Sequence, residues 1–210
     1  MPSKFRVRNI FKKKIVKVVS KGLIKIGITP NLATIIMLCF SILSFVSIWP
    51  IKNLLLFSIF VFITTLLDGC DGTIARMTNR SSSFGGFFDS VMDRISEFFI
   101  FLGLLLFNWN RLLWNFLDVK LIVYISFLAS LMISYSRTRA ECFFSGDFDV
   151  GLMGRSERLF YIFITIIFAH FYGYVDIFLF VFMLSLIATV IFRIIKIYNQ
   201  IKSQANNIER

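Results

Sequence analysis

The sequence predicts an all-α integral membrane protein, in which six transmembrane helices follow an N-terminal amphipathic helix at the membrane interface. Hydrophobic residues make up 57% of the 210 residues, whereas a soluble domain is about 45–50% apolar. The mean hydropathy is +0.78, and the apolar residues fall in long runs. A chain of this length accommodates about six spans of roughly 20 residues each, which leaves no room for a sizeable soluble domain.

Residues 1–28 are predicted to form the interfacial amphipathic helix. Nine Lys and Arg lie within residues 4–25 and alternate loosely with apolar residues. One helical face can then collect Phe5, Ile10, Phe11, Ile15 and either Val18 or Val19. Such a helix lies in the headgroup region with its lysines towards anionic lipid; a disordered basic tail is the alternative. A cleaved signal peptide is not expected, because no apolar segment precedes about residue 32.

Apolar runs and turn signals place the six spans along the chain. The first span begins where Thr29 suits a helix cap and Pro30 suits a first helical turn. We expect spans at about residues 31–49, 52–77, 84–107, 119–142, 156–173 and 175–198. Between them lie the Trp49-Pro50 pair, a polar turn at 79–83, a linker at 108–118 with two tryptophans suited to an interface, and a Gly-rich loop at 143–155. Residues 29–200 would form one six-helix transmembrane domain, followed by a cytoplasmic tail at 201–210.

The distribution of basic residues predicts the topology. With the N-terminus inside, 20 of the 23 Lys and Arg fall in inside segments. Lysine and arginine accumulate on the cytoplasmic side of membranes. We therefore expect a multi-pass protein of the cell membrane with cytoplasmic N- and C-termini. The net charge of +11 can also indicate nucleic-acid binding, but its placement favours a membrane face, so no nucleic-acid partner is expected.

Four aspartates gather around the turn between the second and third spans. Asp68 and Asp71 are three residues apart and Asp89 and Asp93 are four apart, so on helices each pair shares a face. A carboxylate costs about 2.5–3.5 kcal/mol at the bilayer centre on insertion scales, and four like charges repel one another. Carboxylate oxygens suit Mg²⁺ or Mn²⁺, and Mg²⁺ often bridges carboxylates to substrate phosphates. The pattern therefore predicts a divalent-metal site at the cytoplasmic face.

Glycines and an arginine accompany the aspartates. Glycine inside a helix costs roughly 1 kcal/mol relative to alanine, so the clustering of glycines indicates close approach by a ligand or by another backbone. The glycines are Gly69, Gly72, Gly85 and Gly86. Arg76 is placed to clamp a phosphate. Two alternatives remain: internal salt bridges of the aspartates with Arg76, Arg80 and Arg94, or a channel or transporter ion site, which would place acids towards the midplane.

The spacing of these residues resembles the signature of the CDP-alcohol phosphotransferase family at all of its eight fixed positions. The pattern here is Asp68-x2-Asp71-Gly72-x2-Ala75-Arg76-x8-Gly85-x3-Asp89-x3-Asp93. The resemblance implies transfer of a phosphatidyl-type group from a CDP-linked lipid to an alcohol, with release of CMP. It also implies a membrane-bound homodimer, which the residues themselves do not indicate.

The resemblance further implies a role for each matching position. Asp68, Asp71, Asp89 and Asp93 would hold two divalent ions per site, Mg²⁺ or Mn²⁺, against the CDP diphosphate. Asp93 would also take the proton from the attacking hydroxyl. The CDP-lipid would lie against Gly72, Ala75, Arg76 and Gly85, with Asn31 and Thr34 from the first span.

A second informative stretch, residues 134–159, carries Arg137, Arg139, Arg155 and Arg158, and Arg193 follows near the inner end of the last span. Guanidinium groups match the geometry of phosphate, so the cluster favours an acceptor that carries a phosphate. Ordinary enrichment of basic residues on the inner face is the alternative. The segments SYSRTRAE and RSERL resemble the phosphatidylinositol-phosphate and archaetidylinositol-phosphate synthase branch, which implies that Arg137, Arg155 and Arg193 bind the acceptor phosphate. The sequence departs from that branch at Arg137, where Lys is common, and at Gly154, where an acidic residue is common.

The predicted reaction is transfer of a diacylglycerol or archaeol phosphate group from a CDP-lipid to myo-inositol 1-phosphate. Within the family, a phosphatidylglycerophosphate-type synthase and a phosphatidylserine- or archaetidylserine-type synthase are the alternatives. A UbiA-like prenyltransferase would need a larger bundle and a second acidic motif. A divalent-cation transporter is the non-enzyme alternative. The sequence does not distinguish diacylglycerol from archaeol, or Mg²⁺ from Mn²⁺.

Overall fold

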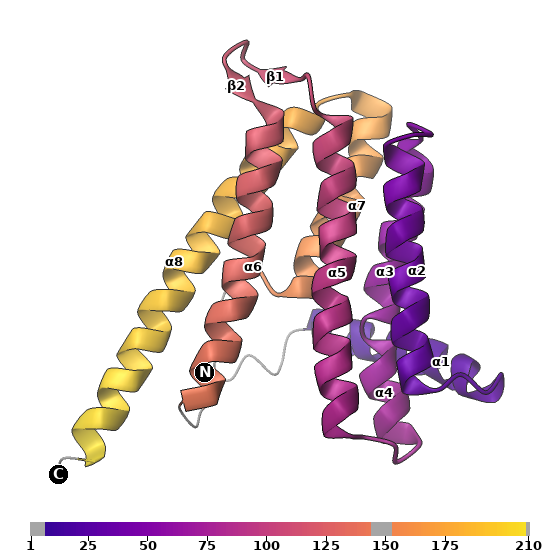
Figure 1. Cartoon of the computed structure of the whole chain (residues 1–210), viewed down its shortest axis with the longest axis vertical. Helices are drawn as coiled ribbons and strands as arrows, with labels where there is room; N and C mark the ends of the chain where they lie inside the picture. Colours follow the sequence, from indigo (N-terminus) through magenta and orange to yellow (C-terminus); the bar gives the residue numbers. More distant parts are fainter. Residues whose placement is uncertain (1–6, 144–152, 209–210) are drawn as a thin grey trace. The chain divides into compact units, whose positions relative to one another are not determined.

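The computed structural model describes the backbone of residues 7–143 and 153–208, and the side chains of residues 14–143 and 153–203. This part of the chain is helical apart from one short hairpin (Figure 1). The elements are α1 (Val7–Lys25), α2 (Pro30–Ile48), α3 (Leu54–Leu67), α4 (Cys70–Met77), α5 (Ser83–Phe107), β1 (Leu112–Leu113), β2 (Leu117–Asp118), α6 (Val119–Phe143), α7 (Arg155–Tyr172) and α8 (Val175–Ile208). The chain divides into two compact units, Met1–Ile100 and Phe101–Arg210, and each is described here by itself.

Four helical segments are long and apolar enough to cross a membrane. They are Pro30–Ile48, Leu54–Met77, Val119–Phe143 and Val175–Ser203. The other two predicted spans correspond to α5 and α7, which are regular helices but carry several charged residues beside their apolar stretches. The all-helical membrane class is thus confirmed, whereas the number of six spans stays a prediction.

In the first unit, α2 packs along α3 and α4, and α1 packs on α4. The start of α2 follows the expected chemistry, because the Thr29 side chain accepts a hydrogen bond from the Leu32 N–H at 3.4 Å and Pro30 occupies the first turn. The Asn53 side chain caps α3 by accepting from the Leu56 N–H at 3.0 Å. Caps of this kind satisfy N–H groups that have no partner within the helix.

The predicted helix at 52–77 is interrupted between its two aspartates. α3 ends at Leu67 and α4 begins at Cys70, although Asp68 (φ −50°, ψ −31°) and Gly69 (φ −95°, ψ −8°) between them both keep right-handed helical backbone angles. The placement of Asp68 and Asp71 on one helical face stays a prediction. Backbone polar groups within a membrane need partners from the protein, and side chains provide them at this break. The Cys70 thiol donates to the Leu66 carbonyl at 3.2 Å, and the Thr73 hydroxyl donates to the Gly69 carbonyl at 2.9 Å.

The predicted apolar face of the first helix is only partly covered, because Val19 packs against the core next to α4 whereas other residues of that face are exposed. Val16 is buried in a small core with Ala33, Cys70 and Ile74. Ile15 and Val18 are instead exposed, at 50% and 69% of their surface. The predicted face also included Phe5, Ile10 and Phe11, whose side chains lie outside the described residues. Tertiary packing against α4 decides which side of α1 is covered, and the helical periodicity alone does not reveal it.

In the second unit, α6 and α7 both pack against α8. A three-residue turn, Trp114 to Phe116, joins β1 to β2, with positive φ at Trp114 (53°) and Asn115 (61°) and with Leu113 paired to Leu117. This hairpin was not predicted from the sequence, because the turn lacks the glycine that usually marks such backbone angles. The last helix continues to Ile208, so the predicted tail begins as part of α8. Most of the predicted Gly-rich loop, residues 144–152, lies outside the described residues.

Candidate active site

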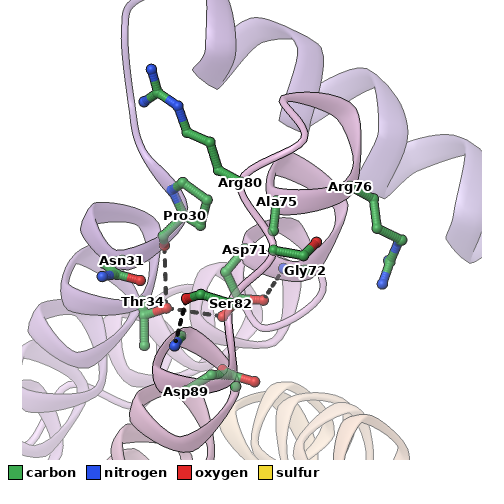
Figure 2. A pocket seen from close by; sticks show the side chains of 13 residues that line it. Pro30, Asn31, Thr34, Asp71, Gly72, Ala75, Arg76, Arg80, Ser82 and Asp89 are labelled. Atoms are coloured by element: carbon green, nitrogen blue, oxygen red, sulfur yellow. Dashed lines mark hydrogen bonds between the residues drawn. The ribbon is translucent and has the colours of Figure 1, made fainter.

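A pocket of about 180 Å³ opens in the first unit, where the start of α2, one side of α4, the turn after α4 and the start of α5 meet (Figure 2). Its lining residues are Pro30, Asn31, Thr34, Asp71, Gly72, Ala75, Arg76, Arg80, Ser81, Ser82, Gly85, Gly86 and Asp89. All six residues predicted to contact a CDP-lipid therefore line one pocket, together with two of the four aspartates. Three helices that are separate in sequence contribute to it.

The Asp71 carboxylate is a buried, hydrogen-bonded acid of the pocket. The side chain is buried, with 6% of its surface exposed. One carboxylate oxygen accepts a hydrogen bond from the Thr34 hydroxyl at 3.0 Å, and the other accepts from the Gly72 N–H at 2.5 Å (Figure 2). Hydrogen bonds to an ionised acceptor are stronger than those between neutral groups. Thr34, predicted to face a nucleotide, therefore orients a carboxylate in this structure.

The turn into α5 has its own cap. The Ser82 hydroxyl accepts a hydrogen bond from the Gly85 N–H at 3.0 Å. A Cβ added at Gly85 would lie 3.0 Å from the Ser82 hydroxyl oxygen and 3.6 Å from Oδ1 of Asn31, so a side chain at this position would crowd the Ser82 cap while making only ordinary contact with α2. Ser82 was not among the predicted site residues. Its signal was present in the sequence, because a serine just before an apolar helical run is typical of an N-cap.

The arginines beside the pocket do not neutralise its acids. In Figure 2 the guanidinium groups of Arg76 and Arg80 point away from Asp71, and both side chains are exposed. Arg76 Nη2 donates to the Thr73 hydroxyl at 3.4 Å, and Arg94 donates to the Ser90 carbonyl. Within residues 14–143, these contacts do not support the alternative in which Arg76, Arg80 and Arg94 form salt bridges with the aspartates.

Asp68 and Asp93 do not line the pocket. Asp68 caps the C-terminal end of α3, and Asp93 lies one turn beyond Asp89 on α5; both are partly buried. Among the described residues, no group of three or more His, Cys, Asp or Glu side chains stands in an arrangement that could hold a metal ion. The donor chemistry nevertheless fits a hard divalent cation, because carboxylate oxygens are the ligands that Mg²⁺ and Mn²⁺ prefer.

The predicted acceptor arginines belong to the second unit. Arg193 is buried and donates to the Ile133 carbonyl at 2.8 Å. Arg137 forms an ion pair with Glu141, with Nε and Oε1 2.8 Å apart. Arg155 is the first residue of α7 and is partly buried.

Arg158 was not selected from the sequence, yet it is the largest fully buried side chain among the described residues and donates to the Ser134 hydroxyl at 3.3 Å. Its position three residues after Arg155, on the same helical face, was the available signal. Arg158 and Arg193 thus contact adjacent residues of α6, at Ser134 and Ile133.

Comparison with known proteins relates the chain to one family. The model of the CDP-alcohol phosphatidyltransferase family matches residues 27–196. The archaetidylinositol phosphate synthase of Pyrococcus horikoshii is 37% identical over 150 residues, which cover 71% of this chain and 75% of that protein. The phosphatidylinositol phosphate synthase of Mycobacterium tuberculosis is 33% identical over 144 residues, which cover 67% of this chain and 64% of that protein.

The fold of this chain is also similar to solved structures of one of these synthases. The crystal structure of the Mycobacterium tuberculosis phosphatidylinositol phosphate synthase with CDP-DAG bound has a TM-score of 0.72 and 25% identity, over 88% of this chain and 94% of that chain. A second structure of that enzyme, in complex with manganese and citrate, has a TM-score of 0.74 and 24% identity, over 87% of this chain and 88% of that chain.

Proposed function

The chain belongs to the CDP-alcohol phosphatidyltransferase family, and we propose that it transfers a diacylglycerol or archaeol phosphate group from a CDP-lipid to myo-inositol 1-phosphate, releasing CMP. One observation carries the proposal: six of the eight signature residues, all but Asp68 and Asp93, line a single pocket together with Asn31 and Thr34 of α2. The choice of acceptor rests on the similarity to synthases named for archaetidylinositol phosphate and phosphatidylinositol phosphate.

Asp68, Asp71, Asp89 and Asp93 are proposed to hold two divalent ions, Mg²⁺ or Mn²⁺. Such ions, when bound, stabilise the negative charge of a diphosphate and of its leaving group. Asp71 and Asp89 already lie at the pocket. The other two carboxylates, those of Asp68 at the end of α3 and of Asp93 one turn beyond Asp89 on α5, would have to turn towards it. A solved structure of similar fold is a complex with manganese, which supports a divalent ion as the cofactor.

The proton of the acceptor hydroxyl is proposed to pass to the carboxylate of Asp93. The hydroxyl oxygen then forms a bond to the phosphorus that carries the lipid. The bond from that phosphorus to the oxygen shared with CMP breaks, and CMP leaves with that oxygen. Asn31, Thr34, Gly72, Ala75 and Gly85 would shape the site for the cytidine diphosphate, and Arg76 would turn inward to contact a phosphate.

The acceptor phosphate is proposed to bind Arg137, Arg155 and Arg193. The Ile133 carbonyl fixes one N–H of Arg193, which orients its guanidinium group. Arg137 would exchange its ion pair with Glu141 for the acceptor phosphate, a small cost because both side chains are more than 40% exposed and an exposed ion pair contributes only about 0–1 kcal/mol.

The membrane arrangement is likewise a proposal. α5 and α7 would supply two further spans, so that six helices cross the cell membrane and α1 lies on its inner surface. Both termini and the pocket would face the cytoplasm, in keeping with the distribution of Lys and Arg. Assembly as a homodimer is proposed from the family resemblance alone.

The test is release of CMP by the purified protein with Mg²⁺. CDP-diacylglycerol and CDP-archaeol would be compared as donors, and inositol 1-phosphate, glycerol 3-phosphate, serine and free inositol as acceptors. We expect release with inositol 1-phosphate. Release with glycerol 3-phosphate or serine alone would keep the reaction class and reject the acceptor. Metal flux into sealed vesicles without CMP release would favour the transporter alternative.

Replacing Arg155 by Gln is expected to raise the KM for inositol 1-phosphate by about tenfold or more, because a charge-assisted hydrogen bond contributes about 1.5–3 kcal/mol. The KM for the CDP-lipid should change little. Steady-state kinetics with each substrate varied in turn measures both values. Arg139→Gln is the matched control, since the Arg139 guanidinium stacks on the Phe143 ring at 4.2 Å. Equal effects of the two substitutions would contradict a specific role for Arg155.

Replacing Gly85 by Ala is expected to weaken CDP-lipid binding, because the new Cβ would lie 3.0 Å from the Ser82 hydroxyl oxygen and disturb the hydrogen bond by which Ser82 caps α5 at the wall of the pocket. Equilibrium binding of a CDP-lipid measures the effect. Gly86→Ala adds the same methyl group to the next residue, where it meets nothing within 4 Å, and should have a much smaller effect. A larger loss in Gly86→Ala would contradict the steric explanation.

A further inference from the structure

We propose that Val16 and Ser20 of α1 are positioning residues for the break between α3 and α4, so that the docking of α1 sets the divalent-metal affinity of the site. The inference deepens the proposed function, since it takes from it that Asp68 and Asp71 are metal ligands. Val16 and Ser20 lie outside the motif of the four aspartates, and Gly69 and Cys70 occupy its two variable positions between Asp68 and Asp71.

The first contact is the close approach of Val16 to Gly69. A Cβ added at Gly69 would lie 3.2 Å from Cγ2 and 3.4 Å from Cγ1 of Val16. Gly69 has φ −95° and ψ −8°, a conformation open to other residues, so its backbone does not require glycine. The absence of a side chain at Gly69 is explained by the space that the isopropyl group of Val16 occupies.

The second contact is one helical turn along α1. The hydroxyl of Ser20, which is fully buried, donates to the Cys70 carbonyl at 3.4 Å. The Cys70 side chain is also fully buried, and its sulfur lies 3.2 Å from the Leu66 carbonyl and 4.0 Å from the Val16 carbonyl. α1 therefore contacts the residues on the α4 side of the break through both its backbone and its side chains.

The contact of α1 with Gly69 and Cys70 is connected to the Asp71 carboxylate in two ways, through the chain and through α2. Cys70 directly precedes Asp71 in the chain. On α2, Ala33 belongs to the same buried cluster as Val16 and Cys70, and the adjacent Thr34 donates to Asp71. A shift of α1 thus changes the placement of Asp71 and of its hydrogen-bond donor together. Residues that orient metal ligands from behind typically change metal affinity by about 10–100-fold when they are replaced.

The pair Val16 and Gly69 allows a compensating test. Gly69→Ala should lower the affinity for Mn²⁺ by about 10–100-fold, because the methyl group pushes against Val16. Val16→Ala removes both of the atoms that the methyl group would meet, so the double variant should recover most of the lost affinity. Gly22→Ala, also on α1, is the control, since a Cβ at Gly22 meets nothing within 4 Å, and it should bind Mn²⁺ as the unchanged protein does.

Affinity would be measured by titrating the full-length protein with Mn²⁺ in the absence of CDP-lipid and following free Mn²⁺ by electron paramagnetic resonance. The thermal midpoint of each variant would be recorded alongside. Weakened binding in Gly69→Ala that Val16→Ala restores supports the proposal. If Gly69→Ala keeps its Mn²⁺ affinity and only its thermal midpoint falls, the contact is ordinary packing and the proposal is overturned. A double variant that binds Mn²⁺ as weakly as Gly69→Ala would also overturn the proposal.

Ser20 provides an independent variant in case Gly69→Ala does not fold. Ser20→Ala should weaken Mn²⁺ binding, whereas Ser20→Thr, which keeps the hydroxyl, should retain more of the affinity; equal affinity of Ser20→Ala and the unchanged protein would overturn the proposal. Failure of the proposed reaction is distinguishable, because the unchanged protein would then bind Mn²⁺ with the predicted variant effects but release no CMP with any of the four acceptors.

Discussion

Replacing Asp93 by Asn is expected to reduce CMP release by about 100- to 10,000-fold, the contribution of a positioned general base. The amide has nearly the shape of the carboxylate but cannot accept the proton of the acceptor hydroxyl. Asp93 is one of four proposed metal ligands and does not line the pocket, so CDP-lipid binding should weaken much less than the rate falls, because three carboxylates remain to hold the metal. The two readouts are the initial rate of CMP release and the equilibrium binding of a CDP-lipid in the presence of Mg²⁺.

Asp118→Asn is a suitable control for Asp93→Asn. It removes a partly exposed carboxylate of β2 that pairs with Lys120, with Oδ1 and Nζ 3.6 Å apart, and it should leave the rate near that of the unchanged protein. A rate for Asp93→Asn close to that of the control would exclude Asp93 as the base. Loss of CDP-lipid binding together with the rate would instead assign Asp93 mainly to the metal site.

Replacing Asp71 by Asn is expected to abolish CMP release and to weaken Mg²⁺ or Mn²⁺ binding. The weakening should be so large that a high metal concentration does not restore the rate. The local structure should survive this change. The amide oxygen can still accept from the Gly72 N–H, and the Thr34 hydroxyl can turn to accept from the amide nitrogen, because a hydroxyl both donates and accepts. The loss is therefore one of charge at a buried position rather than of packing.

The Mg²⁺ dependence of Thr34→Val should be compared with that of Asp71→Asn. Thr34→Val removes the hydrogen bond to Asp71 and keeps the carboxylate, so metal affinity should fall by only about 10–100-fold and the rate should return at high Mg²⁺. Rates measured across a wide Mg²⁺ range distinguish the two variants. An unchanged Mg²⁺ dependence in Asp71→Asn would remove Asp71 from the proposed metal ligands.

Most helices could be located from the sequence because their signals are local. Thr29 and Pro30 mark the start of α2, and the observed helix begins at Pro30. The polar turn at 79–83 marks the start of α5, and α6 begins at the predicted Val119. The break at Asp68 and Gly69 was not predictable in the same way, because an apolar run followed by a single glycine is compatible with a continuous helix.

The sequence by itself determined that this is an all-helical membrane protein of one enzyme family, since hydropathy, charge distribution and motif spacing are properties of the chain alone. It also determined which residues carry oxygen ligands for a divalent ion. Only the tertiary structure decided that Thr34 meets Asp71, 37 residues away, and that Val16 fills the space above Gly69. The periodicity of a helix tells which residues share a face, but which face is covered, and by what, depends on how helices distant in sequence pack their side chains together.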